Sequence, residues 1–242
     1  MFGFRHKLPE DFFRGASDIH SHLLPGVDDG FRTERKSLEA LKSLEARGMA
    51  RMVLTPHFMK DYPDNDSQSI RAKFEAFKVK AAEVSQIELR LAGEYMLDSR
   101  FMDHFKQGLL TLDKAGVHVL CETSYMMNDR NASQMIYEIM LEGISPVVAH
   151  PERYMYASMD TYEKWKDKRY KFQLNLLSLS GMYGKPAVSK ALQLLENDFY
   201  DFVGSDIHAL ENFEHFLSRI RLSYSNIDKL KTLWENNNRL LG

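Results

Sequence analysis

The chain has 242 residues, 44% of them hydrophobic, and a formal net charge of −2, so it gives no electrostatic reason to expect nucleic acid or an anionic membrane as a main partner. No apolar run reaches the roughly 18 residues of a transmembrane helix, and the opening MFGFRHKLPEDFF lacks the apolar core of a signal peptide. The single cysteine, Cys121, excludes an intrachain disulfide. We therefore expect a cytoplasmic protein without membrane insertion.

Short strand-like runs alternate with longer helix-like stretches along the chain. In chain order, we predict a strand at 17–20, a helix at 32–47, a strand at 52–55, a helix at 66–84, a strand at 87–94 and a helix at 99–107. Further on, we predict strands at 117–122, 146–150, 171–175 and 199–205, separated by helices at 132–142, 161–169 and 185–197, and then a mostly helical tail. No linker or repeat interrupts this order, which indicates one α/β domain over residues 1–242.

The connection after the first strand helps to choose between two α/β architectures. Its sequence, DIHSHLLPG, has neither of the glycine-rich patterns that cradle phosphates in nucleotide-binding open sheets. About seven βα units in a chain of this length favour a TIM-like barrel instead. The sequence therefore predicts a barrel of parallel strands surrounded by helices.

Histidine, aspartate or glutamate follows all but one of the predicted strands. These strand-end residues are His20, His22, Asp28, Asp29, His57, Glu94, Glu122, His150, Asp206 and His208. Because the C-terminal ends of barrel strands meet at one rim, we expect these side chains to converge there. The set exceeds what one ion needs, and imidazole with carboxylate suits manganese, iron or zinc. We therefore predict a site for two or three divalent ions.

Each residue taken alone has a structural alternative. An HxH pair is a weak signal, His150 precedes a proline and could cap a helix, and Asp206 is of a preferred helix-capping type. Side chains alternate along a strand, so Cys121 and Glu122 should face opposite ways. The histidines away from the strand ends are expected to be structural or superficial, namely His6, His104, His118 and His215.

Arg153 lies three residues after His150, on the same predicted rim. A guanidinium binds phosphate oxygens through a planar fork, although a surface salt bridge with Glu152 or Asp160 is the alternative. A cysteine-dependent phosphatase needs an arginine six positions after its cysteine, and here that position holds methionine. Three aromatic residues near the rim could stack on a substrate ring, although aromatic side chains at strand ends more often serve packing: Tyr95, Tyr125 and Tyr154.

These stretches together resemble the PHP (polymerase and histidinol phosphatase) superfamily and, within it, the capsule-biosynthesis tyrosine phosphatases of the CpsB/YwqE type. The matching stretches are DIHSHLLPGVDDG at 18–30, TPH at 55–57, AGE at 92–94, Glu122, VAHPERY at 148–154 and GSDIH at 204–208. The resemblance implies a distorted (β/α)7 TIM-like barrel forming one PHP metallophosphatase domain. It also implies a trinuclear centre, often of manganese, that hydrolyses phosphotyrosine on the tail of a tyrosine autokinase in capsular or exopolysaccharide biosynthesis.

The resemblance also implies roles for individual residues. The implied metal ligands are His20, His22, Asp29, His57, Glu94, Glu122, His150, Asp206 and His208. Arg153 carries over as the phosphate clamp, and we predict Arg153, His57 and His208 as catalytic residues in the attack of a metal-activated hydroxide on phosphorus. Whether a metal ion or a rim histidine assists the leaving phenolate stays open.

This sequence departs from the family pattern at one point. An arginine usually follows the GSDxH motif as a second phosphate contact, but here Asn212 and Phe213 occupy that stretch. Lys185, Arg219 or a backbone amide could replace it. Two other functions therefore stay open: another phosphoesterase of the superfamily, such as a histidinol-phosphate phosphatase or a nuclease-like enzyme, and a catalytically silent metal-binding scaffold. The oligomeric state is unknown at this stage.

Overall fold

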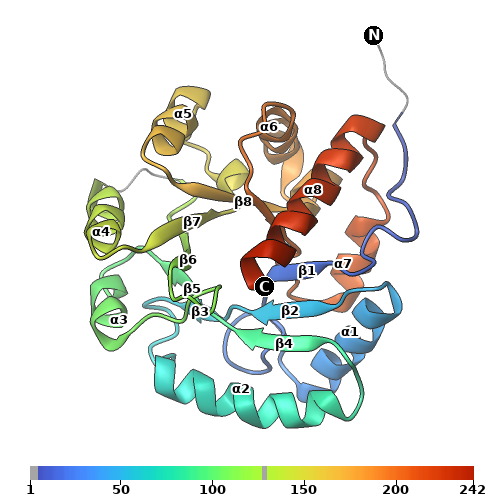
Figure 1. The fold of residues 1–242 in the computed structure, drawn as a ribbon, viewed down its shortest axis with the longest axis horizontal. Helices are drawn as coiled ribbons and strands as arrows, with labels where there is room; N and C mark the ends of the chain where they lie inside the picture. The colour runs from blue at the N-terminus through green and yellow to red at the C-terminus, as the bar shows by residue number, and fades with distance from the viewer. Residues whose placement is uncertain (1–4, 127–129) are drawn as a thin grey trace.

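The computed structural model describes residues 5–126 and 130–242, and it places parallel strands inside a ring of helices (Figure 1). The strands are β1 (Ser17–Ser21), β2 (Arg51–Leu54), β3 (His57–Phe58), β4 (Glu88–Leu91), β5 (Glu94–Met96), β6 (His118–Glu122), β7 (Ser145–Ala149), β8 (Lys171–Asn175) and β9 (Phe202–Gly204). The helices are α1 (Glu34–Ala46), α2 (Ser67–Ala82), α3 (Phe101–Gln107), α4 (Arg130–Leu141), α5 (Met159–Asp167), α6 (Gly184–Glu196), α7 (Leu210–Leu217) and α8 (Tyr224–Leu241). Two short 3-10 helices, η1 (Pro151–Arg153) and η2 (Leu176–Ser180), were not predicted.

All strand pairs in the two sheets are parallel, which confirms the predicted α/β class. One sheet has the order β1-β2-β4, and the other has the order β3-β5-β6-β7-β8-β9. The chain runs from β2 into β3 across Pro56, which has no N–H for a ladder, and from β4 into β5 across Ala92 and Gly93. The strand predicted at 87–94 is therefore two short strands, and the described residues form two sheets rather than one closed sheet.

The first and last strands approach each other at the end that carries the histidines. The backbone N–H of Asp206 donates to the carbonyl of His20 at 2.9 Å, and that of His22 donates to the carbonyl of Ile207 at 3.1 Å. Farther down, the amide of Asn237 in α8 donates to the carbonyls of Ser17 and Val203 at 2.8 and 2.6 Å. These contacts join β1 to β9 where no sheet ladder is formed.

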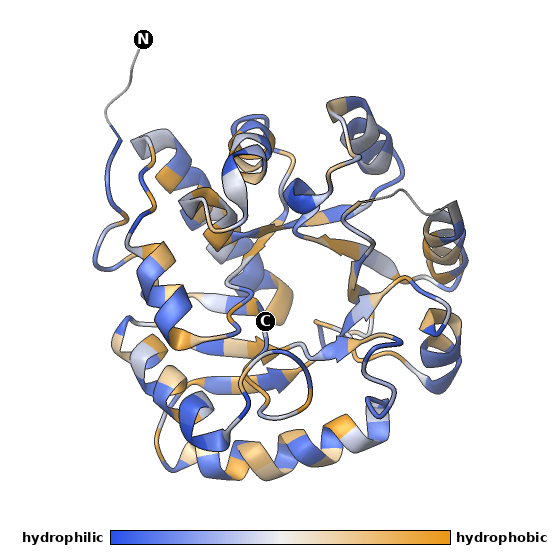
Figure 2. Ribbon diagram, turned by 180° about the vertical axis from the view of Figure 1, so that it is seen from behind, coloured by the Kyte–Doolittle hydropathy of each residue, from blue (hydrophilic) through white to orange (hydrophobic). Residues whose placement is uncertain are grey.

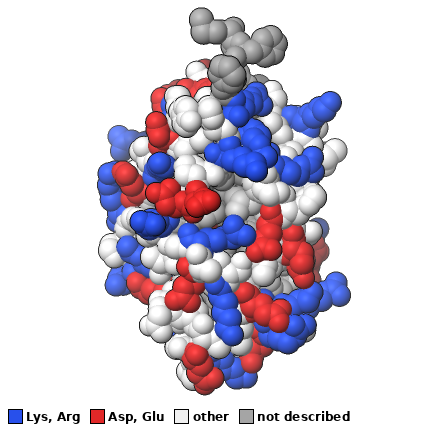
Figure 3. Space-filling view, turned by 90° about the vertical axis from the view of Figure 1, so that its right-hand side faces the viewer, with Lys and Arg blue, Asp and Glu red and all other residues white. Residues whose placement is uncertain are grey.

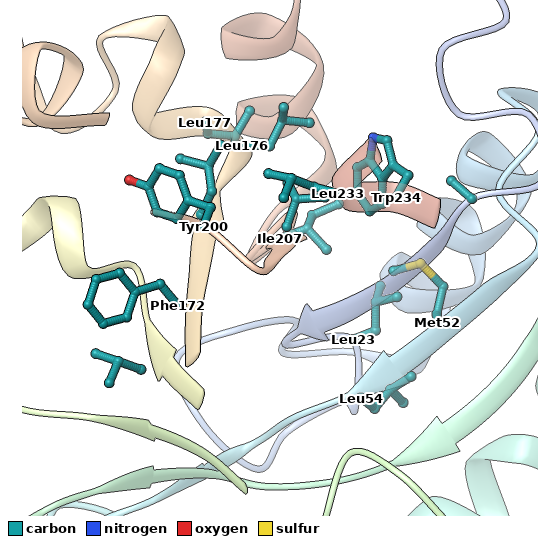
Figure 4. Close-up of a cluster of buried hydrophobic side chains, with 14 of the residues drawn as sticks. Leu23, Met52, Leu54, Phe172, Leu176, Leu177, Tyr200, Ile207, Leu233 and Trp234 are labelled. Atoms are coloured by element: carbon teal, nitrogen blue, oxygen red, sulfur yellow. The ribbon is translucent and has the colours of Figure 1, made fainter. Parts of the chain in front are cut away.

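Alternating side chains give the strands an inner and an outer apolar face. The inner cluster consists of Ile19, Val53, Ala92, Leu112, Leu120, Val147, Ala149, Phe202 and Leu241. The outer cluster packs against the helices, and Figure 4 shows part of it, with side chains from β2 (Met52, Leu54), β8 (Phe172) and α8 (Leu233, Trp234). In β6, Leu120 belongs to the inner cluster and Cys121 to the outer one. Cys121 and Glu122 therefore face opposite ways, as predicted.

The end of α8 closes the interior at the end opposite the histidines. In Figure 1 the C-terminus lies over the centre of the ring of strands. Leu241 is 2% exposed and belongs to the inner cluster. Arg51 in β2 donates to the carbonyl of Gly242 at 3.0 Å, and Arg90 in β4 donates to that of Leu241. The apolar interior is thus sealed by a side chain that two arginines hold in place.

The outer surface is mixed in both polarity and charge. Hydrophilic and hydrophobic residues alternate along the helices of the ring (Figure 2), and acidic and basic side chains are interspersed on the face shown in Figure 3. Within residues 5–126 and 130–242, no helix is both long enough and apolar enough to span a membrane.

We expect Leu241→Ala to lower the free energy of unfolding by about 2–4 kcal/mol, because it opens a cavity in the inner cluster. Leu141→Ala is the matched control, since Leu141 ends α4 with 67% of its surface exposed. The control should change stability by less than about 0.5 kcal/mol. Urea denaturation measures both variants, and equal losses would show that Leu241 does not close the core.

Candidate metal centre

His20 and His22, in β1 and just after it, point one ring nitrogen each at the same spot. Nδ1 of His20 lies 2.9 Å from Oε1 of Gln173, and Nδ1 of His22 lies 2.8 Å from Oδ2 of Asp28. The two Nε2 atoms face each other at 3.2 Å. A hydrogen bond to the far nitrogen is how proteins orient imidazole ligands toward a metal. The two rings are therefore oriented so that both could bind one metal ion.

Glu94, the first residue of β5, lies at the centre of the cluster. Its Oε2 lies 3.2 Å from Nε2 of His20, 3.3 Å from Nε2 of His22 and 3.0 Å from Nδ1 of His57. Burial opposes ionisation of this carboxylate, but the positive potential of His20 and His57 holds the pKa of Glu94 well below its usual range. The centre therefore contains a buried carboxylate that stays charged.

The other predicted ligands surround this centre from further strand ends. His150 Nε2 lies 2.9 Å from Oε1 of Glu94, and Oε1 of Glu122 lies 3.3 Å from Nδ1 of His57. Oδ1 of Asp29 lies 3.4 Å from Nε2 of both His57 and His208.

Asp206 approaches the centre from beyond the end of β9. Its Oδ1 lies 3.4 Å from Nε2 of His20 and 3.3 Å from that of His22. The structure thus brings together every residue of the ligand set that the sequence predicts.

Two of these residues adopt a backbone conformation that is uncommon outside glycine. His150 has φ of 34° and Asp206 has φ of 51°, both in the left-handed region. Each stands directly beyond a strand, where the chain turns sharply. Such conformations recur at functional sites, where the surrounding structure holds them.

The loop between β1 and α1 folds back so that Asp28 and Asp29 reach the histidines. Gly30 makes this possible, since a Cβ there would lie 2.4 Å from the carbonyl oxygen of His22. Asp28 is mostly buried and accepts hydrogen bonds from the N–H groups of Gly30 and His57 as well as facing His22. Asp28 therefore orients ligands, while Asp29 faces the open side of the cluster.

The cluster fits divalent ions by its chemistry and by its unpaired atoms. Nδ1 of His57 and Oε2 of Glu94 are buried and lie 3.0 Å apart, but neither forms a hydrogen bond, so both atoms are available to an ion. Separations of about 3 Å between nitrogen and oxygen atoms match the spacing of ligand atoms that each lie about 2.1 Å from one ion. Burial lowers the pKa of His22, but Asp28 and Asp206 raise it well above the usual range overall. The cluster thus attracts positive charge, which divalent ions supply.

Arg153, at the end of η1, lies between two tyrosine rings at the edge of the centre. Its guanidinium carbon lies 4.5 Å from the ring centroid of Tyr125 and 4.1 Å from that of Tyr183. Nη1 donates to Oδ2 of Asp206 at 3.0 Å. Among the described residues, neither Glu152 nor Asp160 forms an ion pair with it, so the predicted alternative of a surface salt bridge with them is wrong.

Glu152 accepts three hydrogen bonds in the interior instead of forming a salt bridge with Arg153. Its buried carboxylate accepts hydrogen bonds from the Asn175 N–H at 3.0 Å, the Ser178 hydroxyl at 2.7 Å and the Tyr200 hydroxyl at 2.9 Å. Burial raises its pKa above the usual value. Glu152 thereby ties η1 to β8 and η2, which fixes the loop that carries His150 and Arg153.

An open cavity of about 490 Å³ lies over the cluster. Its aromatic walls are Tyr62, Tyr125 and Tyr183, and Arg153 is the only lysine or arginine among its described lining residues. Tyr95 in β5 and Tyr154 at the end of η1 are fully buried in the outer core, which confirms the packing role and excludes them from stacking on a substrate.

The missing second arginine has no substitute among the residues proposed for it. Lys185 and Arg219 do not line the cavity, and the Arg219 guanidinium lies over the ring of Phe216 instead. Phe213 is fully buried in the outer core. Among the described residues, Arg153 is therefore the only lysine or arginine that can meet an anion in this cavity.

The prediction from sequence did not include Gln173 and Asn175, because β8 contains no ionisable residue at its end. Gln173 contacts Nδ1 of His20, and Nδ2 of Asn175 donates to Oδ2 of Asp206 at 2.6 Å and to the hydroxyl of Tyr183 at 3.2 Å. The signal was present in KFQLN, where two amides alternate with Phe172 and Leu174. Amides at inward positions of a buried strand need partners.

The fold and the site define a class: α/β proteins of parallel strands with a histidine–carboxylate centre suited to divalent ions. The chain belongs to the CpsB/CapC family of capsular polysaccharide synthesis, whose model matches residues 16–232.

Named relatives and a solved structure are similar over most of the chain. Tyrosine-protein phosphatase YwqE of Bacillus subtilis (strain 168) is 28% identical, over 79% of this chain and 76% of its own length. Tyrosine-protein phosphatase CpsB of Streptococcus pneumoniae is 28% identical, over 81% of this chain and 84% of its own length. The fold also matches a chain from the crystal structures of YwqE and CpsB, described as unique metal-dependent tyrosine phosphatases, with a TM-score of 0.74, 24% identity and 93% coverage of each chain.

We expect Asp28→Asn to weaken divalent-metal binding about 10–100-fold, because the His22 ring loses its charged orienting partner. Competition with a chelating dye measures the affinity, and thermal unfolding of the metal-free protein checks the fold. Asp61→Asn is the control, since Asp61 lines the same cavity with an exposed side chain. Equal affinities for the two variants would contradict an orienting role for Asp28.

Proposed function

We propose that this protein is a metal-dependent protein-tyrosine phosphatase. The observation that carries the proposal is the single cavity in which Arg153 stands beside the converged imidazoles and carboxylates. An arginine next to a divalent-metal centre suits a phosphate ester better than an uncharged substrate. The names of the relatives, all tyrosine-protein phosphatases, point to phosphotyrosine as the ester.

The proposed centre holds two or three divalent ions, with manganese first and iron or zinc as alternatives. Its proposed ligands are His20, His22, Asp29, His57, Glu94, Glu122, His150, Asp206 and His208. One group of candidate ligands contains His20, His22 and Asp206, a second contains His57, Glu94 and Glu122, and the other two share members with these. Shared ligands suit ions that lie close together.

We also propose that the strands form a distorted (β/α)7 barrel of the PHP type. Two features support this: the paired breaks at β2/β3 and β4/β5, and the backbone hydrogen bonds between the ends of β1 and β9. In this barrel, β2 and β3 together form one interrupted strand, and β4 and β5 together form another. The domain would then extend over residues 1–242.

Divalent ions bound here would supply hydroxide at neutral pH and offset the charge of the phosphoryl oxygens. The chain's own contribution begins with Arg153, whose free N–H groups would orient the phosphate. Nδ1 of His208 lies 2.9 Å from the carbonyl of Asp206. Because a carbonyl only accepts, the proton of His208 is held on Nδ1 and its Nε2 suits a ligand rather than an acid. His57 is a proposed ligand as well, so a proton for the leaving phenolate comes more readily from solvent than from either histidine.

Cys121 does not suit the role of nucleophile. Its thiol is 1% exposed and lies on the outer face of β6, away from the cavity. Burial raises the pKa of Cys121 to about 12, so the thiol stays protonated at neutral pH. The proposed reaction therefore needs no covalent cysteine intermediate.

The proposed substrate is the phosphorylated tail of a tyrosine autokinase in capsular or exopolysaccharide synthesis. Membership of the CpsB/CapC family supports the biosynthetic setting. The cytoplasmic location stays a prediction, which cell fractionation would test.

We expect EDTA to abolish hydrolysis of a phosphotyrosine peptide and manganese to restore it, whereas Cys121→Ser keeps its activity. The assay is phosphate release, run beside histidinol phosphate and an oligonucleotide. Faster turnover of either competitor would replace the proposed substrate by another phosphate ester. Activity that survives EDTA, or that is lost in Cys121→Ser with metal still bound, would contradict the mechanism.

We expect Arg153→Ala to lower kcat/KM for p-nitrophenyl phosphate roughly 100-fold, because the phosphoryl oxygens lose the guanidinium that orients them. Metal analysis should show the same metal content as in the unmodified protein. Arg219→Ala, which removes an exposed arginine outside the cavity, should keep its activity. If Arg153→Ala instead loses its metal, the arginine acts by holding Asp206 in place.

A further inference from the structure

A second hollow of about 530 Å³ opens beside the catalytic cavity. We call it the side groove; the residues that line it but not the cavity are Glu152, Met155, Pro186, Ala187 and Lys190. Tyr125, Arg153 and Tyr183 line both the groove and the cavity. A molecule whose phosphate meets Arg153 can therefore continue past the two tyrosines into the groove.

The charged side chains of the side groove are already paired within the protein. Nζ of Lys190 donates to the carbonyls of Tyr154 at 2.5 Å and Ala157 at 2.8 Å. Glu152 is fully engaged by its three hydrogen-bond donors, and Arg153 donates to Asp206. The groove thus offers no free charge on its far side.

What the groove does offer is apolar surface. Met155 is 60% exposed, and at the start of α6 Pro186 is exposed while Ala187 is buried. Met155 donates its backbone N–H to the carbonyl of Tyr125 at 2.8 Å, which fixes its place beside the tyrosine, and Met126, the next residue after Tyr125, is 72% exposed. Methionine side chains adapt to varied apolar partners. Exposed apolar side chains gathered beside a cavity indicate a binding surface.

We infer that the side groove binds an apolar side chain of the substrate protein, close in sequence to the phosphotyrosine. This inference rests on the proposed function and deepens it, because the enzyme would then read the peptide as well as the phosphate. The volume lies within the range of about 300–1,000 Å³ that is usual for ligand sites, which is ample for one large side chain and its backbone.

The test compares phosphotyrosine peptides that differ only in one flanking residue. Leucine is placed in turn at each of the positions near the phosphotyrosine, with serine at the same position as reference. We expect one position at which leucine raises kcat/KM about tenfold, chiefly through a lower KM. The measured quantity is the ratio of kcat/KM for the peptide to that for p-nitrophenyl phosphate, which has no flanking residues.

Met155→Glu should reduce this ratio for the preferred leucine peptide about tenfold, because a charge enters the apolar groove. Val79→Glu is the matched control, since Val79 on α2 is 66% exposed and lines neither hollow. The control should keep the preference for leucine.

Two results would overturn the inference. Equal rates for leucine and serine at every position would do so, and so would an undiminished preference in Met155→Glu. Both leave metal-dependent turnover intact and are thereby distinct from failure of the proposed function. Absence of turnover on all phosphopeptides and on p-nitrophenyl phosphate would overturn the proposed function, and this inference with it.

Discussion

The buried carboxylate of Glu94 is the charge on which the arrangement of the site depends. A buried ion without partners costs several kcal/mol, and here three imidazole nitrogens stand 3.0 to 3.3 Å from one of its oxygens. The rings come from β1 and β3, and His57 is in direct register with Glu94 across the β3–β5 pair. A shift of any of these strands would leave a buried charge unpaired. The register at this end of the fold is thus set by electrostatics as well as by packing.

Below the cluster, the interior changes from polar to apolar within one layer. Gln173 and His20 meet Gly204 there, where a Cβ would lie 2.6 Å from Cβ of His20 and 2.9 Å from Nε2 of Gln173. Only glycine fits so close an approach without displacing its neighbours. Below this layer lies the inner apolar cluster that Leu241 closes. The apolar layer provides stability that a layer of buried charges cannot. The close packing of Gly204 against His20 and Gln173 fixes the direction of the His20 ring.

The sequence predicted that these histidines and carboxylates lie together, because strand direction determines where strand-end residues meet. Once strands are parallel, residues at their C-terminal ends must share one edge, whatever the lengths of the connecting loops. Strand position alone left two roles open for Tyr95 and Tyr154, and their burial in the outer core selects packing over stacking on a substrate. The prediction also passed over Gln173 and Asn175, whose amides do not look like ligands although they orient them. The walls of the cavity, such as Tyr62 and Tyr183, lie on connections whose path no periodicity predicts.

Contacts with two tyrosines hold the Arg153 guanidinium in place, which favours phosphate binding by one arginine where a second is absent. Its guanidinium carbon lies 4.5 Å from the ring centroid of Tyr125 and 4.1 Å from that of Tyr183, and these two contacts restrict the movement of the guanidinium. The Tyr125 hydroxyl donates to Glu122 at 2.9 Å, and Tyr183 is tied through Asn175 to Asp206. Each tyrosine thus connects the guanidinium to a carboxylate of the centre. An arginine held in this way loses little conformational entropy when it meets a phosphate, and its position follows that of the proposed ligands.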